Sequence, residues 1–173
     1  MRLFLALCFL FGALAVHAQS ISTTAPQPTN NTDKTGQFGL GLQVGGFSGI
    51  VGDYWDSPKS SWGIGLFKEF DNRGGYSGIQ AGHTWIFPHT FGGIASEVAP
   101  YIGAGALLGL GQSSYYFSTH NEYSALAVQV PLGVEWLPAA QRFAVYAELI
   151  PSLEISPVGD TFFTADLGAR LYY

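Results

Sequence analysis

The sequence predicts an all-β protein, an eight-stranded antiparallel up-and-down transmembrane β-barrel. Three observations carry this prediction. From Gly36 onward, apolar residues recur at every second position, which is the period of a β-strand. The 173-residue chain is 47% hydrophobic and 11% charged, yet no run of 18 or more apolar residues follows residue 18. Glycine supplies 23 residues, which disfavours helices, and a closed barrel is then the structure that pairs every backbone group in a bilayer.

The N-terminus has the pattern of a cleavable secretory signal peptide, which we place at residues 1–18. A short basic start precedes an apolar stretch, and a small residue, Ala18, stands before the expected cleavage point. Residues 19–35 are rich in Ser, Thr, Asn, Pro and Gln and show no period, so we expect a flexible leader. The barrel domain is expected at 36–173. Cys8 is the only cysteine, so the mature chain cannot form a disulfide.

The first four strands are expected at 37–45, 48–55, 61–70 and 75–86. Three of them have one apolar face opposite a mostly glycine face, and the apolar faces are Phe38, Leu40, Leu42 and Val44, then Trp62, Ile64 and Leu66, then Ile79, Ala81, His83 and Trp85. The segment 48–55 alternates least, but it completes the even number of strands that brings both chain ends to one side. Turn-forming residues separate these segments.

The last four strands are expected at 99–110, 123–137, 142–155 and 161–173. The strongest alternation lies in 123–137, where the apolar face is Leu126, Val128, Val130, Leu132, Val134 and Trp136. The two segments that follow repeat the pattern, with Phe143, Val145, Ala147 and Leu149 on one apolar face and Ala165, Leu167, Ala169, Leu171 and Tyr173 on the other. Clusters containing proline mark the turns after 137 and after 155.

The apolar face of these strands is expected to point outward. The opposite face carries glycine together with a few polar and charged side chains, and the lumen of an eight-stranded barrel is only wide enough for side chains. A soluble barrel would place its large apolar residues inside, whereas a membrane barrel turns them toward lipid. Ten residues at about 3.3 Å each, tilted by about 40°, span roughly the 25 Å apolar band of such a barrel.

One basic residue, Arg170, is placed inside the barrel by this register, where an unpaired charge is costly. Counting back from the turn at 138–141 sets Glu135 opposite Ala144. The same count from the next turn sets Ala144 or Tyr146 opposite Arg170. We therefore expect an ion network in the lumen that consists of Glu135, Glu148, Asp166 and Arg170. Glu135 is the expected main partner of Arg170, and the network predicts a plugged lumen instead of an open pore.

Aromatic residues gather where the strands approach the side that holds both chain ends. The expected periplasmic aromatic girdle consists of Phe38, Trp55, Trp62, Trp85, Tyr101, Trp136, Phe143 and Tyr173. It includes all four Trp residues of the chain. Amphipathic rings at one depth are typical of a membrane interface.

The chain resembles the small eight-stranded outer-membrane β-barrels of Gram-negative bacteria, similar to OmpA and OmpX in architecture, and within them an uncharacterised group of outer-membrane β-barrel proteins. The resemblance rests on the segments 49–55 (GIVGDYW), 130–136 (VPLGVEW) and 166–173 (DLGARLYY), and covers 36–173. It implies location in the bacterial outer membrane, contact with its lipids and delivery by the barrel assembly machinery. The implied C-terminal assembly signal is Ala169, Leu171 and Tyr173, although Phe is commoner than Tyr at the last position.

The leading functional interpretation is a non-enzymatic protein with a structural or adhesive role, carried by surface loops at 71–75, 111–122 and 156–160. Two alternatives stay open: an outer-membrane lipid-modifying enzyme similar to lipid A deacylases, and a soluble lipocalin-like periplasmic carrier. The enzyme would use the Ser, His and Glu of 118–124, whose spacing differs from the His-x-Ser motif of those deacylases. We expect no cofactor, no metal site among His83, His89 and His120, and no nucleic-acid partner at a net charge of −5.

Overall fold

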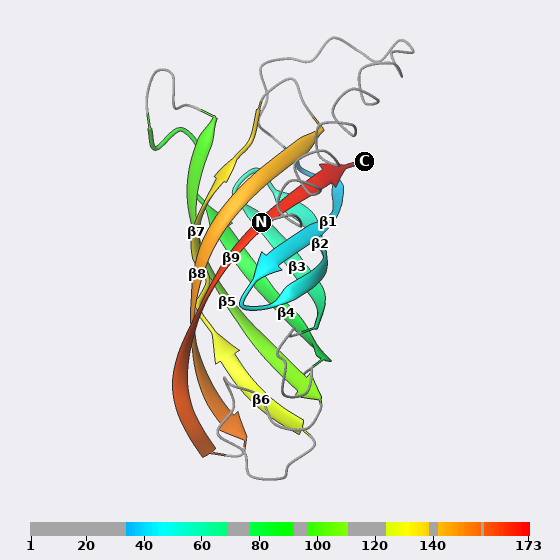
Figure 1. Ribbon diagram of the computed structural model, residues 1–173. Helices are drawn as coiled ribbons and strands as arrows, with labels where there is room; N and C mark the ends of the chain where they lie inside the picture. Colours follow the sequence, from blue (N-terminus) through cyan, green and yellow to red (C-terminus); the bar gives the residue numbers. More distant parts are fainter. Residues whose placement is uncertain (1–33, 69–76, 92–96, 111–123, 139–141, 157) are drawn as a thin grey trace, which may run out of the picture.

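A computed structural model describes residues 34–68, 77–91, 97–110, 124–138, 142–156 and 158–173 (Figure 1). These residues form nine antiparallel strands: β1 (Phe38–Gly45), β2 (Ser48–Ser57), β3 (Ser60–Lys68), β4 (Ser77–Ile86), β5 (Val98–Leu110), β6 (Ser124–Gln129), β7 (Leu132–Trp136), β8 (Phe143–Ser156) and β9 (Val158–Tyr172). No helix in the described ranges is long and apolar enough to cross a membrane.

The strands close into one ring in chain order. β1 pairs with β9, β4 pairs with β5, and β6 and β7 share a single place in the ring because both pair with β5 on one side and β8 on the other. The predicted eight-stranded up-and-down barrel is therefore confirmed. Figure 1 shows β8 and β9 extending well beyond the β1–β2 hairpin. We call the end of the barrel that carries Phe38 and Tyr173 the base, and the opposite end the tip.

The expected strand 123–137 is interrupted at Pro131. Proline has no backbone N–H to donate to a neighbouring strand. The carbonyl of Pro131 still accepts a hydrogen bond from the amide of Gly103 (2.8 Å), and the amide of Val130 donates to the carbonyl of Pro151 (3.0 Å). The wall therefore stays closed across the break between β6 and β7.

The expected loop at 156–160 is mostly strand. β8 reaches Ser156, β9 already begins at Val158, and Ile155 pairs with Val158. The prediction of a surface loop at 156–160 was wrong because strand pairing between β8 and β9 continues almost to the turn that joins them. The other two expected surface loops, 71–75 and 111–122, lie outside the described residues, as do 1–33.

The interior holds two apolar clusters. The tip cluster consists of Phe47, Phe67, Leu107, Ala125, Ala127 and Phe162. The base cluster consists of Trp55, Ile86, Ala99, Tyr101, Leu137, Ala144, Tyr146 and Tyr172. Gln43 connects the two, because its amide nitrogen lies 3.4 Å from the carbonyl of Phe47 while its side-chain oxygen accepts from the Tyr146 hydroxyl at 2.9 Å.

The residues just before β1 contact the base of the barrel. Lys34, in the segment where the sequence predicts a flexible leader, is only 5% exposed, and its ammonium lies 4.8 Å from the ring centre of Tyr172. The backbone here is anchored by hydrogen bonds from Gly36 to Trp55 and from Gln37 to Lys34, both 2.8 Å. Burial lowers the pKa of Lys34, and the negative charges of Glu135 and Asp53 oppose that shift. The two carboxylates therefore offset part of the cost of burying the Lys34 ammonium at the mouth of the barrel.

Candidate functional site

Arg170 lies at the centre of the polar groups in the lumen. Its Nη1 atom donates a hydrogen bond to Oε1 of Glu135 at 3.2 Å, and lies 3.9 Å from Oδ2 of Asp53. The guanidinium also sits over the ring of Tyr146, with 4.0 Å between its central carbon and the ring centre. A cation held between two carboxylates and an aromatic face in a narrow lumen is strongly paired.

The register around this pair differs from the count made along the sequence. Arg170 is opposite Ala144, one of the two expected positions, but Glu135 is opposite Tyr146 and not Ala144. The expected arrangement placed Arg170 and Glu135 on either side of the small residue Ala144. In the structure, the Arg170 side chain instead crosses the Tyr146 ring to reach Glu135. The count along the sequence was therefore two residues off on β8, since Trp136 is likewise opposite Val145.

The other two acidic residues of the expected network have different partners. Glu148 and Asp166 face each other across β8 and β9. Glu148 accepts a hydrogen bond from the Tyr101 hydroxyl at 2.8 Å. Asp166 accepts from the Gln43 amide at 2.8 Å and from the backbone amide of Phe47 at 3.3 Å. The four residues share one lumen, but the direct contact with Arg170 is made by Glu135.

Several members of the lumen network were not identified from the sequence. Asp53 is buried and its Oδ2 accepts hydrogen bonds from Trp55 Nε1 (3.0 Å) and the Tyr172 hydroxyl (3.1 Å). The Tyr172 hydroxyl also lies 3.3 Å from Oε1 of Glu135. These groups tie Asp53 and Glu135 together beneath Arg170. Strand parity identifies Tyr172 as inward-facing, since it shares a face with Arg170, but the weak alternation of 48–55 gave no such signal for Asp53.

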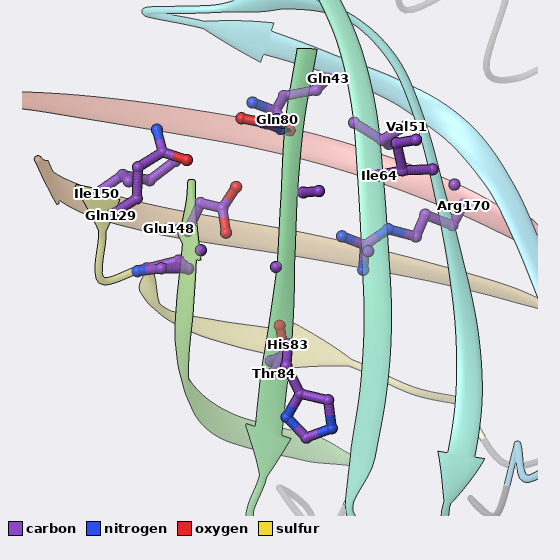
Figure 2. A pocket seen from close by; sticks show the side chains of 16 residues that line it. Gln43, Val51, Ile64, Gln80, His83, Thr84, Gln129, Glu148, Ile150 and Arg170 are labelled. Atoms are coloured by element: carbon purple, nitrogen blue, oxygen red, sulfur yellow. Dashed lines mark hydrogen bonds between the residues drawn. The ribbon is translucent and has the colours of Figure 1, made fainter. Parts of the chain in front are cut away.

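A small cavity of about 80 Å³ remains in the lumen beside Arg170. Figure 2 shows Arg170 and Glu148 among the side chains that line it, with Gln43 and Gln80 close together; Arg170 and Glu148 come from the neighbouring strands β9 and β8. The Gln80 amide lies 3.4 Å from the Gln43 side-chain oxygen. Gly63, Gly82 and Gly105, which are paired across β3, β4 and β5, also line the cavity and contribute no side chains at that level of the wall. A cavity of this size holds only a few water molecules.

The outer wall is apolar. Large exposed side chains on the strands include Leu40, Leu42, Ile50, Ile64, Leu66, Ile79, Ile102, Leu108, Val128, Leu132, Val134, Val145, Leu149, Leu153 and Leu167. In β6, the alternate residues Ala125, Ala127 and Gln129 are buried. The arrangement reverses that of a water-soluble protein, in which the large aliphatic residues lie inside.

The aromatic girdle needs two corrections. Trp55 is 1% exposed and Tyr101 is buried as well, so both belong to the lumen. Tyr54, the neighbour of Trp55, is 48% exposed and takes the outward position. The sequence placed Trp55 outside because a strand residue changes face with every step and 48–55 lacked a clear parity. For Tyr101 the parity was available, since it shares a face with Gly103 and Gly105.

The remaining six residues of the expected girdle lie at the outward surface of the base. Phe38, Tyr54, Trp62 and His83 are successive partners across β1 to β4, and the backbone of Tyr173 pairs with Phe38. Trp85 lies on the same outward face of β4, and on the other side of the barrel Trp136 packs edge-on against Phe143, with 5.6 Å between ring centres. The Trp136 indole donates a hydrogen bond to Glu97 at 3.0 Å.

The expected C-terminal assembly signal lies on the last strand. Leu171 and Tyr173 are exposed on the outer wall, while Ala169 is half-buried on the same face. The residues proposed for an enzymatic site at 118–124 fall outside the described part of the chain, except for Ser124 at the start of β6. His83 and His89 are described, and no group of three or more metal-binding side chains occurs among the described residues.

Comparison with known proteins identifies the fold. No model of a protein family and no curated protein matches the chain. The crystal structure of the N-terminal β-barrel domain of Pseudomonas aeruginosa OprF is similar, with a TM-score of 0.56 and 13% identity over 79% of this chain and 96% of that one. The backbone structure of the Yersinia pestis outer membrane protein Ail in a phospholipid nanodisc matches with a TM-score of 0.41 and 15% identity, over 79% and 97% of the two chains. The similarity to OprF shows that this chain has the fold of a small outer-membrane β-barrel; the Ail match is too weak to add an argument.

Proposed function

We propose that the protein is a non-enzymatic barrel of the bacterial outer membrane whose lumen is closed. The observation that carries the proposal is the reversed wall, with aliphatic side chains outside and charged ones within. Burying such an outer surface in lipid removes the cost of exposing it to water. The aromatic residues at the base suit the level of the lipid headgroups. A soluble periplasmic carrier would instead leave the aliphatic wall in water.

The proposal includes export with removal of 1–18, and assembly guided by Ala169, Leu171 and Tyr173. Its cellular role would be structural or adhesive, exerted by the surface loops at 71–75 and 111–122. The fold shared with the OprF domain supports the outer-membrane location. The test of the location is cell fractionation together with gel mobility. We expect the protein in the outer-membrane fraction, with a mobility that changes on boiling; recovery in the soluble periplasm would contradict the proposal.

We expect an arginine on the outer wall of the barrel to be strongly unfavourable. Leu167→Arg places a charge near the middle of the proposed membrane span and should reduce the free energy of folding into phospholipid vesicles by about 2–4 kcal/mol. The control is Phe87→Arg, since Phe87 is also exposed but lies just beyond the end of β4. Its cost should be about 0–1 kcal/mol. Equal losses for the two variants, measured by denaturant titration, would argue against a lipid-facing wall.

The second expectation concerns ion flow. The tip and base clusters occupy both ends of the lumen, and the cavity between them is about 80 Å³. We therefore expect little or no conductance when the purified protein is inserted into planar bilayers, with insertion verified by the mobility shift on boiling. A large and stable conductance of the wild-type barrel would refute a closed lumen.

A further inference from the structure

We propose that the outer wall at the β2–β3 turn binds the headgroup of a phospholipid that carries a primary ammonium group. The site consists of Asp56, Lys59, Trp62, His83 and Trp85, and it rests on the proposed location in a membrane. The carboxylate of Asp56 meets the imidazole of His83 here, between two outward Trp side chains, and Lys59 is exposed in the same turn. Polar groups at this position are favourable where they meet the charged layer of a bilayer.

Asp56 is held in place but remains accessible. Its Oδ1 accepts a hydrogen bond from the Ser60 hydroxyl at 2.6 Å, and Ser60 Oγ also lies 2.6 Å from Ser57 Oγ across the turn. Its Oδ2 lies 3.7 Å from His83 Nε2. The Asp56 side chain is 39% exposed, against 18% for His83. One carboxylate oxygen can therefore accept hydrogen bonds from a ligand that approaches along the wall.

His83 is fixed between two indole rings. Its ring centre lies 4.6 Å from that of Trp62 and 4.8 Å from that of Trp85, and both pairs meet edge to face. Its Nδ1 is buried and has no hydrogen-bond partner among the described residues. The two Trp side chains are themselves exposed on the outer surface. The imidazole is thus an ordered part of the aromatic surface, with Nε2 directed toward Asp56.

The charges match a zwitterionic headgroup. The carboxylate of Asp56 would accept hydrogen bonds from an ammonium group, and Lys59, which is exposed three residues later in the same turn, would attract the phosphate. The exposed faces of Trp62 and Trp85 suit a cation and the glycerol region beside it. A primary ammonium has N–H groups to donate to Asp56, whereas a quaternary ammonium has none. The geometry therefore favours phosphatidylethanolamine over phosphatidylcholine.

Native mass spectrometry of the full-length mature barrel tests this preference. The probes are phosphatidylethanolamine and phosphatidylcholine with the same acyl chains, titrated separately. An exposed charge pair contributes up to about 1 kcal/mol, so we expect up to about fivefold tighter binding of phosphatidylethanolamine by the wild type. Asp56→Asn should abolish the preference, and His83→Phe, which keeps an aromatic ring, should reduce it.

The matched control is Glu97→Gln, which removes a carboxylate beside an outward Trp at the same end of the barrel. It should keep the preference. No preference in a wild type that inserts into vesicles, or equal losses in Asp56→Asn and Glu97→Gln, would overturn the headgroup site while leaving the membrane location intact. A wild type that stays soluble and does not insert would overturn both.

Discussion

Replacing Arg170 with alanine is expected to lower the free energy of unfolding by about 3–5 kcal/mol, the cost of breaking a buried ion pair by removing one partner. The substitution leaves Glu135 and Asp53 close together without the guanidinium that lies 3.2 Å and 3.9 Å from them. It also removes the contact with the Tyr146 ring. Denaturant titration of the refolded barrel in detergent micelles measures the change.

Arg142→Ala is the control for this variant. Arg142 is exposed directly before β8, and its backbone carbonyl, which accepts from the Tyr172 amide at 2.7 Å, is unchanged by the substitution. We expect a change within about 0.5 kcal/mol, as for most surface substitutions. Equal unfolding midpoints for the two alanine variants would mean that the lumen network does not stabilise the barrel.

Gly168→Val is expected to destabilise the barrel by about 1–3 kcal/mol through overpacking. A Cβ atom at Gly168 would meet the Tyr146 ring and its hydroxyl, because Tyr146 is the cross-strand partner of Gly168 and lies across it. Moving this ring would disturb both the Arg170 contact and the hydrogen bond to Gln43. We therefore expect a lower unfolding temperature and a change in the near-ultraviolet circular dichroism of the buried tyrosines.

The control is Ala169→Val, which also enlarges the side chain but lies one residue later, on the outward face of the same strand. There the extra methyl groups meet no interior ring, and we expect little change in stability. If the two valine variants unfold at the same temperature, the close packing of Tyr146 against Gly168 is not what stabilises this wall.

Strand parity accounts for most of what could be predicted. In 123–137 and 161–173, large apolar residues recur at every second position over most of the segment. The side-chain period of a strand is two, so the inward position of Glu135 and Arg170 follows from this local order. The closed ring follows in the same way, because eight alternating segments separated by turns have no other means of pairing their edges in a bilayer. Trp55 was misplaced because in 48–55 this signal is weak.

The order of residues along the chain is enough to predict the architecture and the direction in which most strands face, because both depend on a repeating local pattern. Which side chains meet depends instead on the folded barrel. The contact of Arg170 with Glu135 across Tyr146 depends on the register between β7 and β8. Lys34 interacts with the charges of Glu135 and Asp53, which are far from it along the chain. The Asp56–His83 pair likewise joins two strands through their register. Such contacts depend on the geometry of turns and on charges that are far apart in the sequence. Neither produces a repeating pattern along the chain from which the contact could be predicted.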